Sequence, residues 1–239
     1  MEIPRQASLF VLLRLAFEEL FGNGRIPPSP LLKALLSRGL GYCILLGSTV
    51  VKVPQLINVV RARSAAGLSS LSVELETLGY AISASYGLLK QLPFSAYGET
   101  MAMLLQNALL LVLIYHYQRK SAARTLCLLL ALAGWAAALT AGALPFDKVA
   151  LALSFNNLLF MASRVPQIVQ SAQAGSTGQL SSITYTLNVA GAGARIFTSI
   201  HEKAGPAMLQ GAILGTLLNA IVLAQILVYG RRAAKGKTE

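Results

Sequence analysis

The composition of this chain indicates a membrane protein. It has 239 residues, of which 55% are hydrophobic and 12% are charged, and its mean hydropathy is +0.61. A soluble domain of this size usually carries about twice that charged fraction. The net charge of +11 does not indicate nucleic-acid binding, because the cations lie between apolar blocks and in the tail, with no basic face of interleaved aromatics.

Cys43 and Cys127 lie in apolar segments, so we expect buried thiols and no disulfide framework.

The first thirty residues form a segment of their own. An apolar run at residues 9–13 is interrupted by Arg14 and then by two glutamates, which makes it short for a signal peptide. We therefore expect an amphipathic helix lying in the membrane interface. The glycines and prolines at residues 22–30 predict a linker before the first membrane span.

Seven apolar stretches of about the 20 residues needed to cross a bilayer follow this linker. In chain order they are residues 39–57, 71–89, 97–117, 126–144, 149–169, 181–200 and 207–229. The last three repeat the first three at an offset of about 112 residues, whereas the fourth has no counterpart. The matched positions include Lys52-Val53-Pro54-Gln55 with Arg164-Val165-Pro166-Gln167, and Asn107 with Asn219.

The unpaired fourth span has a consequence for topology. Three spans turn the chain over, so one further crossing restores its direction and gives two parallel repeats. The predicted fold is therefore an all-α integral membrane protein with seven transmembrane helices, arranged as two parallel three-helix bundles joined by a linking helix. Repeat 1 covers residues 31–120, the linking helix residues 121–146, repeat 2 residues 147–230, and a basic tail residues 231–239.

The distribution of cations predicts the orientation. Nine lie at one predicted side: Arg61, Arg63, Arg119, Lys120, Arg124, Arg231, Arg232, Lys235 and Lys237. Six lie at the other: Arg25, Lys33, Arg38, Lys90, Lys148 and Lys203. The positive-inside rule then predicts a cytosolic C-terminus and an N-terminus across the membrane. In that orientation Lys235 and Lys237 resemble a dilysine retrieval signal of the endoplasmic reticulum, the alternative being a tail that is merely basic.

The duplicated Pro-Gln pairs are the first candidate functional residues. A proline inside a helix removes one backbone donor and opposes the carbonyl four residues earlier, which would be that of Val50 or Ala162. Pro54 with Gln55, and Pro166 with Gln167, therefore predict paired hinges, since each glutamine amide can donate and accept. Two tolerated kinks with structural glutamines are the alternative.

Four further polar residues are candidates for binding a lipid phosphate or a sugar. Asn107 and Asn219 lie mid-span at equivalent positions, where an amide either bridges helices or lines a polar cavity. Asn188 adds an amide to repeat 2 with none at the equivalent position of repeat 1. Arg195 lies inside the sixth span, where a cation is costly unless it snorkels, pairs with a carboxylate such as Glu74 or Glu76, or meets an anionic headgroup.

Residues typical of catalysis or metal binding are not found together in the sequence. No His/Cys/Asp cluster predicts a metal site, and no Ser/His/Asp arrangement is apparent. We expect neither an enzyme nor a cofactor. A proton-coupled carrier needs a carboxylate in its pathway. The acidic residues argue against such a carrier, because they lie near predicted span ends: Glu74, Glu76, Glu99 and Asp147.

The duplicated Pro-Gln pairs in a three-plus-one-plus-three plan resemble the PQ-loop repeat family, which is related to SWEET sugar carriers and cystinosin-type transporters. Further segments resemble the mannose-P-dolichol utilization branch of that family. They are Pro93-Phe94-Ser95 with Gly98-Glu99, Gly178-Gln179-Leu180-Ser181 with Ile183-Thr184, and, most specifically, Ala194-Arg195-Ile196-Phe197-Thr198-Ser199-Ile200 with Glu202. The resemblance covers about residues 31–229.

This resemblance implies a protein of the endoplasmic-reticulum membrane. Its role would be the use of dolichyl-phosphate-mannose and dolichyl-phosphate-glucose in N-glycan, GPI-anchor and related glycosylation, by flipping, presenting or chaperoning the lipid-linked sugar. The implied partners are dolichyl-phosphate-linked sugars, membrane lipids and glycosyltransferases of that membrane, with no nucleic acid. One alternative is a small-solute transporter for sugars or amino acids. A second alternative is a non-transporting scaffold for glycosyltransferases.

Overall fold

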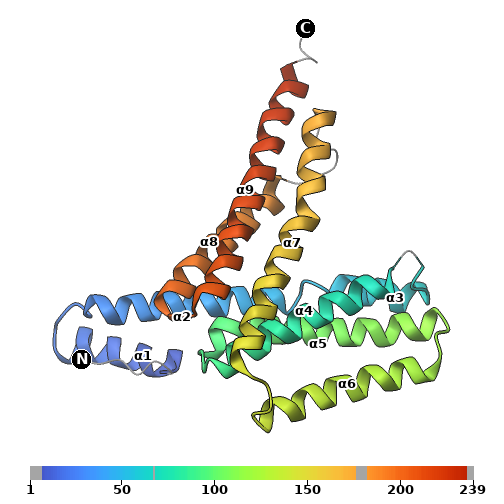
Figure 1. Ribbon diagram of the computed structural model, residues 1–239. Helices are drawn as coiled ribbons and strands as arrows, with labels where there is room; N and C mark the ends of the chain where they lie inside the picture. Colours follow the sequence, from blue (N-terminus) through green and yellow to red (C-terminus); the bar gives the residue numbers. More distant parts are fainter. Residues whose placement is uncertain (1–6, 67, 176–181, 236–239) are drawn as a thin grey trace. The chain divides into compact units, whose positions relative to one another are not determined.

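The computed structural model describes residues 7–66, 68–175 and 182–235, without the side chains of 159–164, 166–167, 170, 174, 183–184 and 230–235. This part of the chain is all-helical (Figure 1). Its elements are α1 (Leu9–Phe17), the π-helix η1 (Glu18–Gly22), α2 (Ser29–Ser48), α3 (Val53–Ala62), α4 (Ser70–Leu89), α5 (Phe94–Tyr117), α6 (Ala122–Thr140), α7 (Phe146–Ala174), α8 (Ser182–His201) and α9 (Pro206–Lys235). They form two compact units, Met1–Leu153 and Ser154–Glu239.

Four segments of the described chain are long and apolar enough to cross a bilayer. They are Ser29–Ala62, Phe94–Tyr117, Ala122–Thr140 and Pro206–Tyr229. Helices α4, α7 and α8 cover the other predicted spans, and Glu74 and Glu76 make α4 more polar. The chain is therefore an all-helical, multi-pass membrane protein, as predicted. Seven crossings in a 3+1+3 plan remain a prediction.

The N-terminal segment packs onto the first long helix. Leu12 of α1 is 1% exposed and lies in a small apolar cluster with Leu31 and Ala34 of α2. Arg38, buried in α2, donates from Nε to the Ala7 carbonyl at 3.3 Å. Helix α2 begins at Ser29, inside the predicted linker and ten residues before the predicted span, because the Pro28–Pro30 sequence starts a helix as well as ending one.

The first unit is built around α5. Helices α4 and α5 lie side by side, and α2 and α3 also contact α5. Gly41 permits the approach of α2, because a Cβ there would lie 2.5 Å from the Ser95 carbonyl oxygen. The core beneath α3 is centred on Leu110, Leu111 and Ile114, all at 0% exposure.

Helix α6 follows α5 as a hairpin and touches the rest of the unit lightly (Figure 1). Trp135 Nε1 donates to Ser85 Oγ of α4 at 2.7 Å. Within the described chain α6 has no buried residue, which suits a helix that faces lipid or other protein. Cys127 of α6 and Cys43 of α2 are exposed, so the expectation of buried thiols was wrong.

The first predicted span is broken in the structure. Residues 39–57 do not form one helix: α2 ends at Ser48, residues 49–52 form turns and bends, and α3 begins at Val53. Pro54 therefore lies in the first turn of a new helix, where its missing N–H costs little. The predicted orphan carbonyl of Val50 accepts from the Val53 N–H at 3.3 Å. The expected kink at Pro54 is thus a complete break placed just before it.

The second unit contains most of α7 together with α8 and α9, which pack along each other. Tyr185, Val222 and Ile226 form its buried apolar cluster, with Ile168 packed against it. Helix α7 stays helical through position 166, in contrast to the break before Pro54. The side chains of Pro166 and Gln167 lie outside the described residues.

Five of the cations that the sequence places on one side lie at one end of the first unit. Gln118 Nε2, at the end of α5, donates to the carbonyls of Ala65 at 3.2 Å and Leu68 at 2.8 Å. The loop after α3 and the turn after α5 therefore lie at one end of the unit. That end carries Arg61, Arg63, Arg119, Lys120 and Arg124. Which membrane side it faces remains a prediction, because the tail that creates the charge bias is largely outside the described side chains.

Candidate functional site

The break between α2 and α3 is held by one side chain, Gln106 of α5. Its Oε1 accepts from the Lys52 backbone N–H at 3.0 Å, and its Nε2 donates to the Ser48 carbonyl at 2.9 Å. The same Nε2 lies 3.0 Å from the Ala102 carbonyl one turn earlier in α5. Gln106 is 7% exposed. In a continuous helix the Lys52 N–H would donate to the Ser48 carbonyl. Here the Gln106 amide, from a neighbouring helix, binds both of these backbone groups instead.

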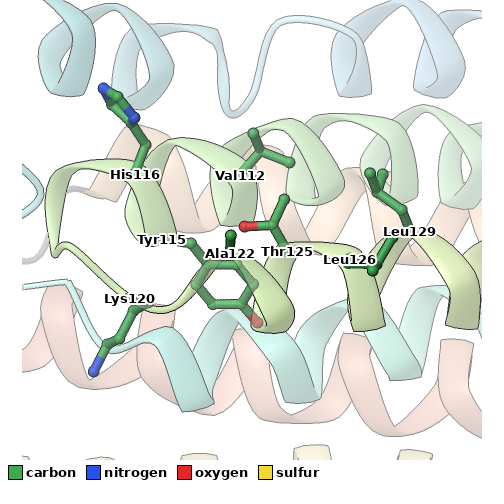
Figure 2. A pocket seen from close by; sticks show the side chains of 8 residues that line it. All are labelled: Val112, Tyr115, His116, Lys120, Ala122, Thr125, Leu126 and Leu129. Atoms are coloured by element: carbon green, nitrogen blue, oxygen red, sulfur yellow. The ribbon is translucent and has the colours of Figure 1, made fainter.

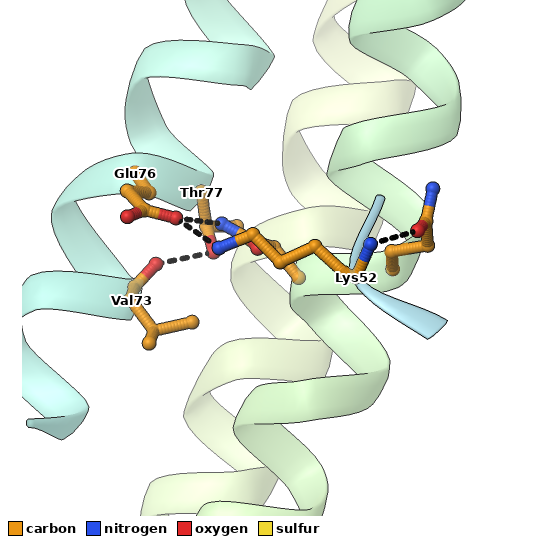
Figure 3. Close-up of polar contacts among 6 residues, drawn as sticks. Lys52, Val73, Glu76 and Thr77 are labelled. Atoms are coloured by element: carbon orange, nitrogen blue, oxygen red, sulfur yellow. Dashed lines mark hydrogen bonds and ion pairs between the residues drawn. The ribbon is translucent and has the colours of Figure 1, made fainter. Parts of the chain in front are cut away.

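A charged cluster lies immediately beside this break. Lys52 Nζ forms an ion pair with Glu76 Oε2 of α4, and Asn107 Nδ2 of α5 donates to the same oxygen at 3.2 Å (Figure 3). Thr77, beside Glu76, donates back to the Val73 carbonyl at 2.7 Å and is satisfied within its own helix. The cluster therefore joins the break to α4 and α5.

Burial differs across the cluster. Asn107 is 0% exposed, the Lys52 side chain is 13% exposed, and the Glu76 side chain is 47% exposed. The Asn107 Oδ1 is buried without a hydrogen-bond partner among the described residues. A carboxylate with one open side, a partly buried cation and an amide acceptor together form an arrangement that can bind a polar or charged ligand group.

The internal repeat carries this cluster into the second unit with changed chemistry. At the offset of 112 residues, Lys52 corresponds to Arg164, Glu76 to Asn188 and Asn107 to Asn219. Repeat 2 therefore has a cation and an asparagine at the equivalent positions, as repeat 1 does, but a neutral amide in place of the carboxylate. The side chain of Arg164 lies outside the described residues. Asn188 is exposed, and Asn219 donates from Nδ2 to the Gly215 carbonyl of its own helix at 2.7 Å.

The second unit has its own polar contacts between helices. Asn157 of α7 donates from Nδ2 to the Ala207 carbonyl of α9 at 2.7 Å. Gln225 of α9 donates to the Ile168 carbonyl at 2.9 Å, two residues after Pro166. The Oδ1 of Asn219 and the Oε1 of Gln225 are buried without a hydrogen-bond partner among the described residues. This unit therefore holds amide acceptors that point at no described donor.

Arg195 lies in the second half of α8 and is partly buried. Thr198 Oγ1 donates to its carbonyl at 3.1 Å. The two carboxylates considered as its partners are engaged within the first unit: Glu74 with Tyr115 and Arg124, and Glu76 with Lys52 and Asn107. The structure thus gives Glu74 and Glu76 partners within the first unit.

The remaining sequence-predicted residues fall in three places. Pro54 is exposed and Gln55 is partly buried in the first turn of α3, away from the middle of any helix. Lys235 ends α9 with its side chain outside the described residues, and Lys237 lies outside them altogether, as does the segment 178–181. Among the described residues no group of three or more His, Cys, Asp or Glu side chains is placed to hold a metal.

Sequence reasoning missed Gln106 and the role of Glu76. Gln106 has no polar counterpart in repeat 2, where Leu218 takes its position, so a search for duplicated residues passes over it. Glu76 lies near the start of α4 along the chain, yet its carboxylate contacts Asn107 in the middle of α5. The contact weakens the argument that no carboxylate reaches mid-span. A polar residue adjacent to a duplicated asparagine was the available signal.

Comparisons with known proteins agree with the repeat. The PQ loop repeat matches residues 36–96 and 151–208, and the ends of the two matches lie the same 112 residues apart as the predicted repeats. A relative from Homo sapiens, solute carrier family 66 member 3, is 26% identical over 200 residues. That alignment covers 83% of this chain and 94% of the relative.

Proposed function

Since this chain is a membrane protein of the PQ-loop repeat family, we propose that it moves or presents a ligand across the membrane through the region around the α2–α3 break. The observation that carries this proposal is the interrupted helix bridged by Gln106, beside Lys52, Glu76 and Asn107. Discontinuous helices with polar groups at their broken ends are where membrane carriers bind their substrates. We expect no enzymatic step.

The ligand we favour is a dolichyl-phosphate-linked sugar, mannose or glucose, in the endoplasmic-reticulum membrane. The resemblance at residues 194–200 supports it, as does the chemistry of repeat 2. There the residue types that form a neutral ion pair in repeat 1 become an arginine and two asparagines. A cation in the membrane without a carboxylate at the equivalent position favours an anion, and an arginine binds phosphate oxygens through two parallel hydrogen bonds.

Arg195 is the second cation assigned to this ligand. A guanidinium about a turn and a half from the end of its span lies at the depth where the phosphate of a dolichyl-phosphate sugar would sit. The amides of Asn188 and Asn219 would form hydrogen bonds with the sugar or the phosphodiester. Arg195→Lys should fold normally and bind less dolichyl-phosphate-mannose, because lysine offers only a point charge. If Arg195 merely snorkels, the lysine variant should behave like the native protein.

The deciding experiment places purified protein in liposomes and measures flipping of dolichyl-phosphate-mannose and uptake of soluble mannose side by side. Flipping without uptake supports the proposal. Asn188→Glu should abolish flipping, because it restores to repeat 2 the carboxylate that pairs with the cation in repeat 1. Thr186→Glu, at an exposed position of the same helix, is the matched charge control and should keep more of the activity. Equal loss in both variants would remove the assigned role of Asn188.

A small-solute carrier is the second candidate, and the contact between Glu76 and Asn107 favours it. The name of the human relative, a solute carrier, points the same way. In this case the liposomes should take up the soluble substrate, and Glu76→Gln should reduce that uptake while leaving the protein folded. Neither flipping nor uptake, with glycosyltransferases co-purifying from the endoplasmic reticulum, would instead favour the scaffold.

Orientation and retrieval are tested separately. We propose a lumenal N-terminus and a cytosolic C-terminus, so a tag at the C-terminus should be digested by protease added to sealed microsomes. Replacing Lys235 and Lys237 by serine should let part of the protein leave the endoplasmic reticulum. An unchanged location would mean that the two lysines only add charge to the tail.

A further inference from the structure

A groove opens between the end of α5 and the start of α6, at the cationic end of the first unit (Figure 2). Its volume is about 490 Å³, within the range of small-molecule sites. The lining residues are Val112, Tyr115, His116, Lys120, Ala122, Thr125, Leu126 and Leu129. Most of this lining is apolar, and its polar groups are concentrated toward the α5–α6 turn.

The inner wall of the groove is fixed by contacts around the buried Tyr115. Tyr115, 3% exposed, donates from its hydroxyl to Glu74 Oε1 of α4 at 2.8 Å. Arg124 Nη2 lies 3.2 Å from the same oxygen, and its guanidinium lies 5.6 Å from the centre of the Tyr115 ring. These contacts hold the ring in place and compensate the charge of Arg124. The groove is thus a preformed feature of the unit.

The mouth of the groove is positively charged. Lys120 lines it from the turn after α5, and Arg119 precedes Lys120 in the same exposed turn. Arg61 and Arg63 lie at this end as well, because Gln118 ties the turn to the loop after α3. The lining contains no carboxylate. The outer wall is apolar and open: Leu126 and Leu129 are 57% and 52% exposed.

We propose that this groove binds an anionic glycerophospholipid. The headgroup phosphate lies against Lys120, and part of one acyl chain lies along Val112, Leu126 and Leu129. Charge complementarity selects this occupant, because an apolar groove with a cationic mouth matches an anionic headgroup joined to an acyl chain. The site is separate from the region assigned to the transported ligand, so it does not depend on the proposed function.

The test titrates the purified full-length protein with phosphatidylserine and with phosphatidylcholine of identical chains, measured by native mass spectrometry. Phosphatidylserine should bind in preference. Lys120→Ser should reduce that preference about fivefold, which corresponds to the attraction between one lysine and an anionic headgroup. Leu129→Trp, at an exposed position that tolerates the larger ring, should fill the groove and weaken both lipids. Lys33→Ser, an exposed lysine of α2 away from the groove, is the matched control and should change nothing.

A phosphatidylserine with a photoreactive group on its acyl chain gives an independent readout. Crosslinks should map to residues 112–129 and should disappear in Leu129→Trp. Equal binding of the two lipids, or an equal loss of preference in Lys33→Ser and Lys120→Ser, would overturn the proposal. Crosslinks confined to other helices would also overturn it, since they would mean that the lipid binds elsewhere on the protein.

Discussion

The two Pro-Gln repeats share a sequence motif but not a backbone. Before Pro54 the chain breaks between α2 and α3, whereas α7 continues as a helix through Pro166. The difference lies outside the motif. Gln106 bridges the break in repeat 1, and the equivalent position in repeat 2 is Leu218, which has no hydrogen-bonding group. A proline permits a break, and a partner on another helix makes the break stable in the membrane.

The second difference concerns charge. In repeat 1 a lysine, a carboxylate and an asparagine meet at the break. At the same positions repeat 2 carries an arginine and two asparagines. A duplicated unit that keeps the cation but loses its carboxylate no longer has an internal counter-charge at that place. The proposed recognition of an anion by repeat 2 rests on this difference in residue type.

The largest expected effect on stability comes from replacing Gln106 by leucine, the residue found at the equivalent position of repeat 2. Gln106→Leu leaves the Lys52 N–H without a partner and the Ser48 carbonyl with only the longer bond from the Val51 N–H, at 3.4 Å. This should lower the free energy of unfolding by about 2–4 kcal/mol. The thermal denaturation midpoint in detergent measures the loss. Gln225→Leu, which removes a single bond to Ile168, should cost about 1 kcal/mol. Equal losses would show that Gln106 does not bridge the break.

The prolines themselves come next. Pro166→Ala should stabilise the protein by about 1–3 kcal/mol, because it restores an N–H donor and removes a ring from a helix interior. Pro54→Ala should change the stability by less than about 0.5 kcal/mol, because the first turn of a helix does not use that donor. Chemical denaturation of the two variants in the same detergent compares them. A large effect of Pro54→Ala would mean that α2 and α3 are continuous in solution.

A smaller effect is expected at a contact found in repeat 2. A Cβ at Gly211 would lie 2.8 Å from Asn157 Oδ1, so Gly211→Ala should displace the amide that holds Ala207 and cost about 1–2 kcal/mol. Gly215→Ala is the control, because its Cβ would lie 4.0 Å from Ala192 Cβ, an ordinary contact. The control should be neutral or slightly stabilising. Thermal midpoints that fall equally in both would contradict the assigned role of Asn157.

The smallest effect is the coupling between Lys52 and Glu76. A double-mutant cycle with Lys52→Met and Glu76→Gln should give a coupling energy of about 0.5–1 kcal/mol, since Glu76 is half exposed and water screens the pair. The four proteins are compared by denaturation at low and high salt, and the coupling should fall as salt rises. Strictly additive changes would mean that the pair does not form.

Much of the architecture was readable from the sequence. The length of the apolar blocks identifies an all-helical membrane protein, because only a helix satisfies its own backbone in lipid over such a length. The offset of 112 residues identified the repeats, and the PQ loop matches agree with it. Asn107 and Asn219 were found as equivalent amides in the same way. These conclusions rest on local composition and on self-similarity, which require no knowledge of packing.

Only the tertiary structure decided which polar groups meet. Gln106 and Asn107 are neighbours in sequence, but successive residues of a helix point about 100° apart. One therefore reaches the α2–α3 break, and the other reaches Glu76 of α4. Likewise, Glu76 lies near a helix end in sequence, yet it contacts the middle of α5. The direction of a side chain follows from how its helix is rotated against its neighbours, and packing over the whole unit sets that rotation.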